Sequence, residues 1–155
     1  MKLGTLQRRA GLALLAATSL VAFAGVACAG EDADANGGDL AVLNAIDTLD
    51  KAGLHDIDES INRARAVPAT ARTAALKMRT VVELTEWPND LEDAAEKLSA
   101  ALDDLAKSLE GDNPDKAKAG AAAKNAHDVE HDFSGEVWEY LYKEAGIGAG
   151  AAAHN

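Results

Sequence analysis

Apolar residues recur every three to four positions in four segments of this chain. That is the period of an amphipathic α-helix, and no segment shows the sustained alternation of a strand. The first segment spans residues 39–65 and is interrupted by Gly53, so a kink or a break is predicted there. The second spans residues 69–86 and stops at Trp87-Pro88, because a residue before proline avoids the helical region.

The third and fourth segments carry the clearest boundary signals. Asn89 is a good N-cap in front of a leucine stripe, and Gly111 is placed to end that helix. The last segment opens with Asn113 as a cap and Pro114 at the first helical position, and its pattern continues to about Glu144.

This pattern predicts an all-α fold. Four amphipathic helices with short connections across residues 39–145 favour an antiparallel up-down-up-down four-helix bundle, the simplest way to bury all four apolar faces. The face of the last helix expected to point inward consists of Ala119, Ala122, Ala126, Val129, Phe133 and Val137.

Residues 1–28 have the features of an export signal. An uncharged apolar run over residues 10–27 ends in small residues and follows three basic ones, Lys2, Arg8 and Arg9. The sequence GVAC ends at Cys28 and favours a lipoprotein signal, in which this cysteine is lipidated and becomes the new N-terminus. Ordinary cleavage after Ala29, which discards the cysteine, and a twin-arginine route are the alternatives.

The location that follows is the cell envelope for a lipoprotein, or the periplasm or the medium after ordinary cleavage. Residues 29–38 are rich in Gly, Asp and Ala without periodicity, and are predicted to be a flexible tether. Residues 146–155 have too little apolar content to pack and are predicted to be a loose tail. Cys28 is the only cysteine, so a disulfide framework is excluded.

Removal of the signal sharpens the charge balance. It leaves 12 basic residues against 26 acidic ones, a formal charge of −14. Such an acidic surface argues against nucleic acid and against an anionic membrane surface as partners, and it attracts cations. The remaining residues, about 125, are enough for one domain with one core.

The candidate chemistry lies in the sequence HDVEH, where His127 and His131 stand four residues apart. On a helical wheel they fall about 120° and 160° from the centre of the inward face, and Glu130 about 60° from it. One interpretation is a solvated helix face that carries two histidines. The other is a cation site, since imidazoles at i and i+4 both reach one metal ion, and Glu130 can join them.

Nitrogen and carboxylate donors of this kind suit copper, nickel or zinc. A tight site needs a further ligand, and His55 supplies it only if Gly53 breaks the first helix, because His55 otherwise lies nearly opposite the core face. HDVEH also matches the H-x-x-E-H pattern of one class of zinc peptidase. Those enzymes need a further acidic ligand and a cleft in a much larger fold, so this interpretation has little support.

Aromatic residues near the end of the last helix are a second candidate surface. The sequence VWEYLY places Trp138, Tyr140 and Tyr142 on more than one side of the helix, wider than one core face requires. An exposed cluster of this kind marks a protein partner, whereas closure of the bundle end is the plainer explanation. The same two explanations, a protein partner or closure of the bundle end, apply to Trp87.

The run LEDAAEKLSAALDDLAKSLEGDNPDKAKAGAAAKNAHDVEHDF, residues 91–133, resembles the last two helices of small exported cytochromes of the b type and the c′ type. The resemblance implies a four-helix bundle outside the cytoplasm and noncovalent haem with His131 as an axial ligand. His127 and Glu130 stand where the c′ type has its two haem-attaching cysteines. Covalent haem is therefore excluded, and the methionine ligand of the b type is absent from the first helix.

Two hypotheses of function follow. The first is a noncatalytic, envelope-anchored acidic bundle that captures a transition-metal ion through His127 and His131. The second is a structural or interaction protein of the envelope without a ligand, in which the aromatic residues bind another envelope protein. Catalysis has little support, because no Ser-His-Asp or Cys-His arrangement and no phosphate-binding glycine loop is present.

Overall fold

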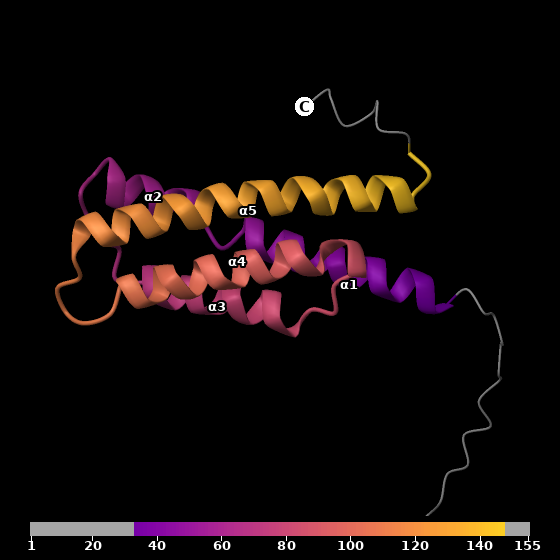
Figure 1. The fold of residues 1–155 in the computed structure, drawn as a ribbon, viewed down its shortest axis with the longest axis horizontal. Coiled ribbons are helices and arrows are strands. Elements are labelled where there is room, and N and C mark those ends of the chain that lie inside the picture. Colours follow the sequence, from indigo (N-terminus) through magenta and orange to yellow (C-terminus); the bar gives the residue numbers. More distant parts are fainter. Residues whose placement is uncertain (1–32, 148–155) are drawn as a thin grey trace, which may run out of the picture. The chain divides into compact units, whose positions relative to one another are not determined.

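The chain is helical in the part that the computed structural model describes, residues 33–147 (Figure 1). The described residues form five helices and no strand: α1 (Ala33–Asp50), α2 (Leu54–Asn62), α3 (Ala71–Leu84), α4 (Asn89–Ser108) and α5 (Lys116–Glu144). The all-α class and the helical bundle predicted from the sequence are confirmed.

Several predictions fall outside this range. The signal segment with Cys28, the first residues of the tether, and residues 148–155 lie outside the described residues. Among α1 to α5, none has an apolar stretch of the length and low charge that crossing a bilayer requires.

α1 begins at Ala33, inside the stretch predicted to be a tether without structure. That prediction is wrong for residues 33–38. Apolar periodicity reports which residues pack, and a helix extends beyond its packed part at little expense, because each added residue also adds a backbone hydrogen bond. The packed part of α1 includes Val42 and Ile46, which are fully buried.

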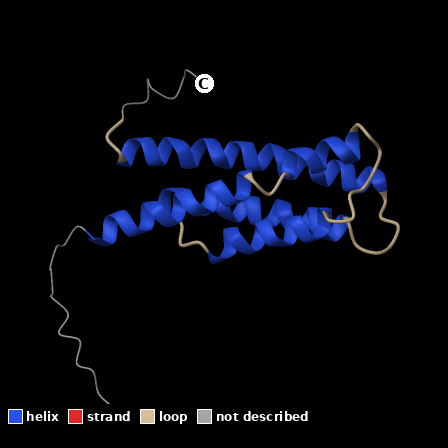
Figure 2. Cartoon of the chain, turned by 180° about the vertical axis from the view of Figure 1, so that it is seen from behind, coloured by secondary structure: helices blue, strands red, loops and turns tan. Residues whose placement is uncertain are grey.

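Gly53 divides the first predicted helix into α1 and α2, and a short loop separates the two (Figure 2). The φ angle of Gly53, 75°, lies in the left-handed region, which glycine adopts without strain. The break gives α2 its own rotation, and α2 places Leu54, Ile57 and Ile61 in the core. The break that the sequence offered as one alternative is therefore confirmed.

α4 packs against both α3 and α5, and α2 packs against α5. Leu98, Leu102 and Leu105 of α4 are fully buried and share one apolar core with residues of all five helices. Burying a leucine side chain stabilises the fold by about 1.5–3 kcal/mol relative to leaving it exposed. The leucine stripe of α4 is thus the main apolar support of the bundle.

Two helix starts differ from the prediction. α4 begins with Asn89 as its first helical residue rather than its cap. α5 is capped by Asp115 rather than Asn113, because the Asp115 carboxylate accepts hydrogen bonds from the backbone N–H groups of Ala117 and Lys118. The N–H groups of Lys118 and Ala117 hold the pKa of Asp115 below its ordinary value. A carboxylate suits the positive end of a helix better than an amide does.

Candidate metal-binding site

The buried face of α5 is rotated relative to the predicted one. Gly120 and Ala123 are buried, whereas Ala122 and Val129 are only half-buried. This rotation moves His127 toward the interior, and its side chain is 15% exposed under the cover of α2. His127 is half-buried and lies outside the apolar core, and His131 is exposed, so both occupy the flank or outer positions expected from the helical wheel.

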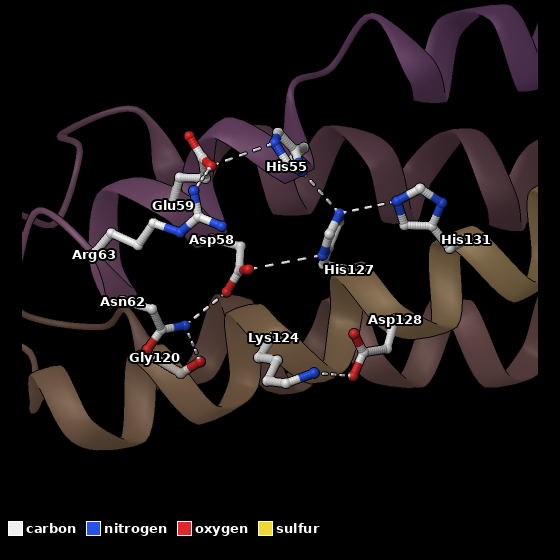
Figure 3. Close-up of polar contacts among 10 residues, drawn as sticks. All are labelled: His55, Asp58, Glu59, Asn62, Arg63, Gly120, Lys124, His127, Asp128 and His131. Carbon is white, nitrogen blue, oxygen red and sulfur yellow. Dashed lines mark hydrogen bonds and ion pairs between the residues drawn. The ribbon is translucent and has the colours of Figure 1, made fainter.

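Three imidazole rings meet where α2 crosses the middle of α5 (Figure 3). His55 Nδ1 lies 3.1 Å from His127 Nε2, and His131 Nε2 lies 3.1 Å from the same atom. The ring centroids are 5.0 Å apart for the first pair and 4.6 Å apart for the second. The structure thus brings His55 to the predicted pair, through the break at Gly53 that the sequence analysis required.

Neutral imidazoles cannot make good hydrogen bonds in both of these contacts. A ring nitrogen carries either one proton or one lone pair, so His127 Nε2 makes one good hydrogen bond, yet two other ring nitrogens approach it. A cation that accepts three lone pairs satisfies all three rings. Nitrogens bound to one tetrahedral zinc ion at the usual bond length are about 3.4 Å apart, so the three rings would have to move and turn before they could bind one ion together.

The three histidines do not have the geometry of a metal-coordination site. Among residues 33–147, no group of three or more His, Cys, Asp or Glu side chains is already arranged to hold a metal ion. The rings contact one another at hydrogen-bond separation. Loading with a metal therefore requires the rings to turn until their lone pairs converge.

Acidic side chains of α2 lie behind two of the rings. Asp58 Oδ2 is 3.7 Å from His127 Nδ1, and Glu59 Oε1 is 3.7 Å from His55 Nε2. Both contacts join a carboxylate to the ring nitrogen that points away from the cluster (Figure 3). Carboxylates that are hydrogen-bonded to this nitrogen are typical of metal-binding histidines. Both carboxylates here lie just beyond hydrogen-bond distance.

A surface pocket of about 470 Å³ opens beside the cluster. Its lining comes from the end of α1, the turn at Gly53, the start of α2 and the middle of α5: Leu49, Asp50, Gly53, Leu54, His55, Asp56, Glu130, His131 and Ser134. Burial raises the pKa of Glu130, the nearby charge of Asp50 raises it further, and His131 opposes the shift. A cation in this pocket relieves the repulsion between the two carboxylates.

Asp128, the first acid of HDVEH, is engaged elsewhere. Its carboxylate accepts a hydrogen bond of 2.6 Å from Lys124 one turn earlier, and this contact lowers the pKa of Asp128. Glu130, which lines the pocket with His55 and His131, is therefore the acid of HDVEH that is placed to join a bound metal.

Haem does not fit this site. The resemblance to exported cytochromes implies His131 as an axial ligand, but the pocket beside His131 is also lined by Asp50, Asp56 and Glu130. These carboxylates repel the propionates of haem and offer the porphyrin little apolar cover.

The aromatic residues near the end of α5, predicted to lie on more than one side of the helix, are divided between two places. Trp138, 37% exposed, lies beside Tyr142 with ring centroids 6.0 Å apart. Tyr140 instead packs against the core, and its hydroxyl donates to Asp39 Oδ1 at 3.2 Å. Burial first, and then the bond to Asp39, raises the pKa of Tyr140.

Trp87 closes one end of the core. Its ring meets the edge of Phe133 at a centroid distance of 4.9 Å, and its indole N–H donates to the Val82 carbonyl at 2.8 Å. Both contacts explain its half-buried position without a partner.

Three residues of the site escaped the sequence analysis: Asp58, Asn62 and Gly120. Asn62 joins the other two by hydrogen bonds to the Asp58 side chain and to the Gly120 carbonyl oxygen. Two signals in the sequence pointed to them. Asp58 and Asn62 are four residues apart on one helix face, and Gly120 interrupts an alanine-rich helix that gains nothing locally from a glycine.

Comparison of the chain with protein-family models, with curated proteins and with solved structures found no match.

Proposed function

We propose that this chain is an acidic helical-bundle protein that captures a transition-metal ion through His55, His127 and His131. The observation that carries the proposal is the approach of two ring nitrogens to within 3.1 Å of His127 Nε2. Glu130 and water from the adjoining pocket complete the coordination. The role is binding rather than catalysis.

The donor set indicates the class of metal. Imidazole nitrogens suit copper, nickel and zinc, whereas calcium and magnesium prefer oxygen ligands. The formal charge of −14 after removal of the signal attracts cations to the surface. Asp50, Asp56 and Glu130 around the pocket concentrate this attraction at the site.

The cellular setting is part of the same proposal. The positive start and apolar run of residues 1–28 support export, and GVAC supports lipidation of Cys28 and anchorage in the envelope. The four apolar segments and their short connections support an antiparallel up-down-up-down arrangement. In it, α1 and α2 together form the first of the four antiparallel segments. Mass spectrometry of the N-terminus of the protein from its native envelope tests lipidation directly.

Titration of the metal-free protein with Cu²⁺, Ni²⁺ and Zn²⁺ tests the metal site. We expect one ion per chain, and we expect the double substitution His127→Ala/His131→Ala to remove this binding. The matched control is His154→Ala, which changes the one histidine outside the described residues and is expected to leave the affinity unchanged. Equal affinity in the double variant and the wild type contradicts the proposal, and a Soret band in the purified protein supports haem instead.

A second candidate function rests on Trp138, an exposed aromatic side chain beside Tyr142. An aromatic pair at the surface fits an interaction module that binds another envelope protein. Cross-linking in the native envelope, compared between wild type and Trp138→Ala, tests it. A cross-linked species that disappears in Trp138→Ala and persists in the double histidine variant favours this function over metal capture.

A further inference from the structure

A continuous chain of polar contacts leads from the backbone of α5, through α2, and back to His127 (Figure 3). The Asn62 amide nitrogen donates to the Gly120 carbonyl oxygen at 2.8 Å and to Asp58 Oδ1 at 2.6 Å. The second oxygen of Asp58 faces His127 Nδ1 at 3.7 Å. The Asp58 side chain is 19% exposed, so water competes weakly for this contact.

Gly120 makes room for this chain of contacts. A Cβ atom at position 120 would lie 2.3 Å from Asn62 Oδ1, closer than any side chain tolerates. The Asn62 amide therefore contacts the α5 backbone at Gly120, with both of its N–H bonds used. Because the amide is held from both sides, it fixes the orientation of the Asp58 carboxylate.

We propose that Asp58 is a positioning residue that sets the proton of His127 on Nδ1 and leaves the lone pair of Nε2 free for a metal ion. Asn62 and Gly120 hold Asp58 in place. The inference rests on the proposed metal function and deepens it by naming the residues that prepare the central ligand. At 3.7 Å the Asp58 carboxylate is just beyond hydrogen-bond distance of His127 Nδ1, and it favours a proton on that nitrogen by electrostatic attraction. When it moves closer and accepts this N–H, it fixes the tautomer and strengthens the ring as a ligand.

Glu59 provides an internal comparison. It approaches His55 Nε2 at the same 3.7 Å, but its side chain is 39% exposed and is also paired with Arg63. Solvent and the competing arginine weaken its hold on His55. The two carboxylates of α2 therefore differ in effect although their distances are equal.

The first experiment compares Asp58→Asn with the matched control Glu59→Gln in the full chain. Asn62 donates to position 58, so the new amide is expected to turn its oxygen toward Asn62 and its NH₂ group toward His127 Nδ1. His127 then carries its proton on Nε2. We expect Zn²⁺ affinity to fall about 10- to 100-fold in Asp58→Asn and less than about fivefold in Glu59→Gln.

The position of the proton is measured separately from the affinity. Long-range ¹H–¹⁵N correlation spectra of the metal-free protein distinguish the two tautomers of each imidazole. We expect His127 to carry its proton on Nδ1 in the wild type and in Glu59→Gln, and on Nε2 in Asp58→Asn. A merely structural role of Asp58 does not predict this exchange.

Gly120→Ala tests the far end of the chain, two helical turns from His127. The new methyl group displaces the Asn62 amide and loosens Asp58, and we expect a partial shift of the His127 proton from Nδ1 toward Nε2 together with weaker Zn²⁺ binding. This variant keeps the inference testable if Asp58→Asn fails to fold.

The inference is overturned if His127 keeps its proton on Nδ1 and Zn²⁺ affinity is unchanged in both Asp58→Asn and Gly120→Ala. If His127→Ala/His131→Ala still abolishes binding in that case, the metal site stands and the positioning role alone is wrong. If the double histidine variant binds Zn²⁺ like the wild type, the metal function itself is wrong.

Discussion

The contacts of α5 with α4 differ in chemistry from its contacts with α2. In the core that it shares with α4, it contributes Ala119, Ala123 and Ala126, all fully buried, beside the leucines of α4. Against α2 it contributes the Gly120 carbonyl oxygen and His127, both of which make polar contacts. One helix therefore adds polar contacts on the α2 side to the apolar core that all the helices share.

The two sides of α5 contribute differently: the α4 side contributes stability, and the α2 side contributes polar and imidazole groups. Apolar burial supplies a large net free energy, whereas a hydrogen bond exchanged for one with water supplies only about 0.5–1.5 kcal/mol. The α4 side therefore holds the fold. Because stability depends little on the polar contacts with α2, that side can hold three imidazoles whose contacts hydrogen bonds alone do not satisfy.

Leu102→Ala is the largest test of this division. Leu102 is fully buried, so removing its side chain leaves a cavity and is expected to lower the free energy of unfolding by about 2–5 kcal/mol. Urea denaturation of the metal-free protein measures the change. Leu84→Ala is the matched control, because Leu84 is 79% exposed and its loss is expected to change stability by less than about 0.5 kcal/mol. Equal effects of the two substitutions contradict the division.

Zinc is expected to strengthen the weaker interface. A metal ion held by His55 of α2 and by His127 and His131 of α5 links the two helices. At a free concentration 100 times its dissociation constant, it should raise the free energy of unfolding by about 2.7 kcal/mol. Denaturation with and without Zn²⁺ measures the gain, and the gain should be absent from His127→Ala/His131→Ala. A similar gain in both proteins places the ion elsewhere.

Arg65→Gly should raise the free energy of unfolding slightly. Arg65 lies in the connection between α2 and α3. Arg65 has a φ of 55°, a left-handed conformation that strains any residue with a side chain. Its carbonyl oxygen accepts a hydrogen bond from Lys116, and glycine keeps that oxygen. The relief of strain exceeds the added flexibility of the unfolded chain by about 0.5 kcal/mol. A lower thermal midpoint in Arg65→Gly contradicts this prediction.

Glu130→Gln gives the smallest effect and tests the pocket in the metal-free protein. The pKa of Glu130 is raised above its ordinary value of 4.5, so the folded state binds its proton more tightly than the unfolded state does. The ionised carboxylate therefore destabilises the fold at a pH above the folded pKa, and this penalty disappears at a pH below 4.5.

Glutamine removes the penalty at neutral pH. Because Glu130 is only half-buried, we expect a gain of about 0.5 kcal/mol or less at pH 7 and none at low pH. Thermal unfolding across the pH range measures the difference between the two proteins. A gain that persists unchanged at low pH assigns the effect to packing rather than to charge.

The local features of this protein followed from its sequence. The leucine stripe of α4 and the break at Gly53 are set by apolar period and by glycine chemistry within a few residues. The approach of His127 and His131 is also local, because residues four apart on a helix lie on the same side. The start of α1 was missed, because apolar periodicity detects packing and α1 extends beyond its packed part.

The tertiary structure decided the rest of the site. The rotation of α5 was not set by its own sequence, because alanines surround its first half and no side is clearly the more apolar. Contact with α2 selected the side that carries Gly120 and His127, and brought His55 and Asp58 to it across about 70 residues of chain. Local periodicity fixes spacing along one helix, whereas the choice of neighbour is made by packing between helices.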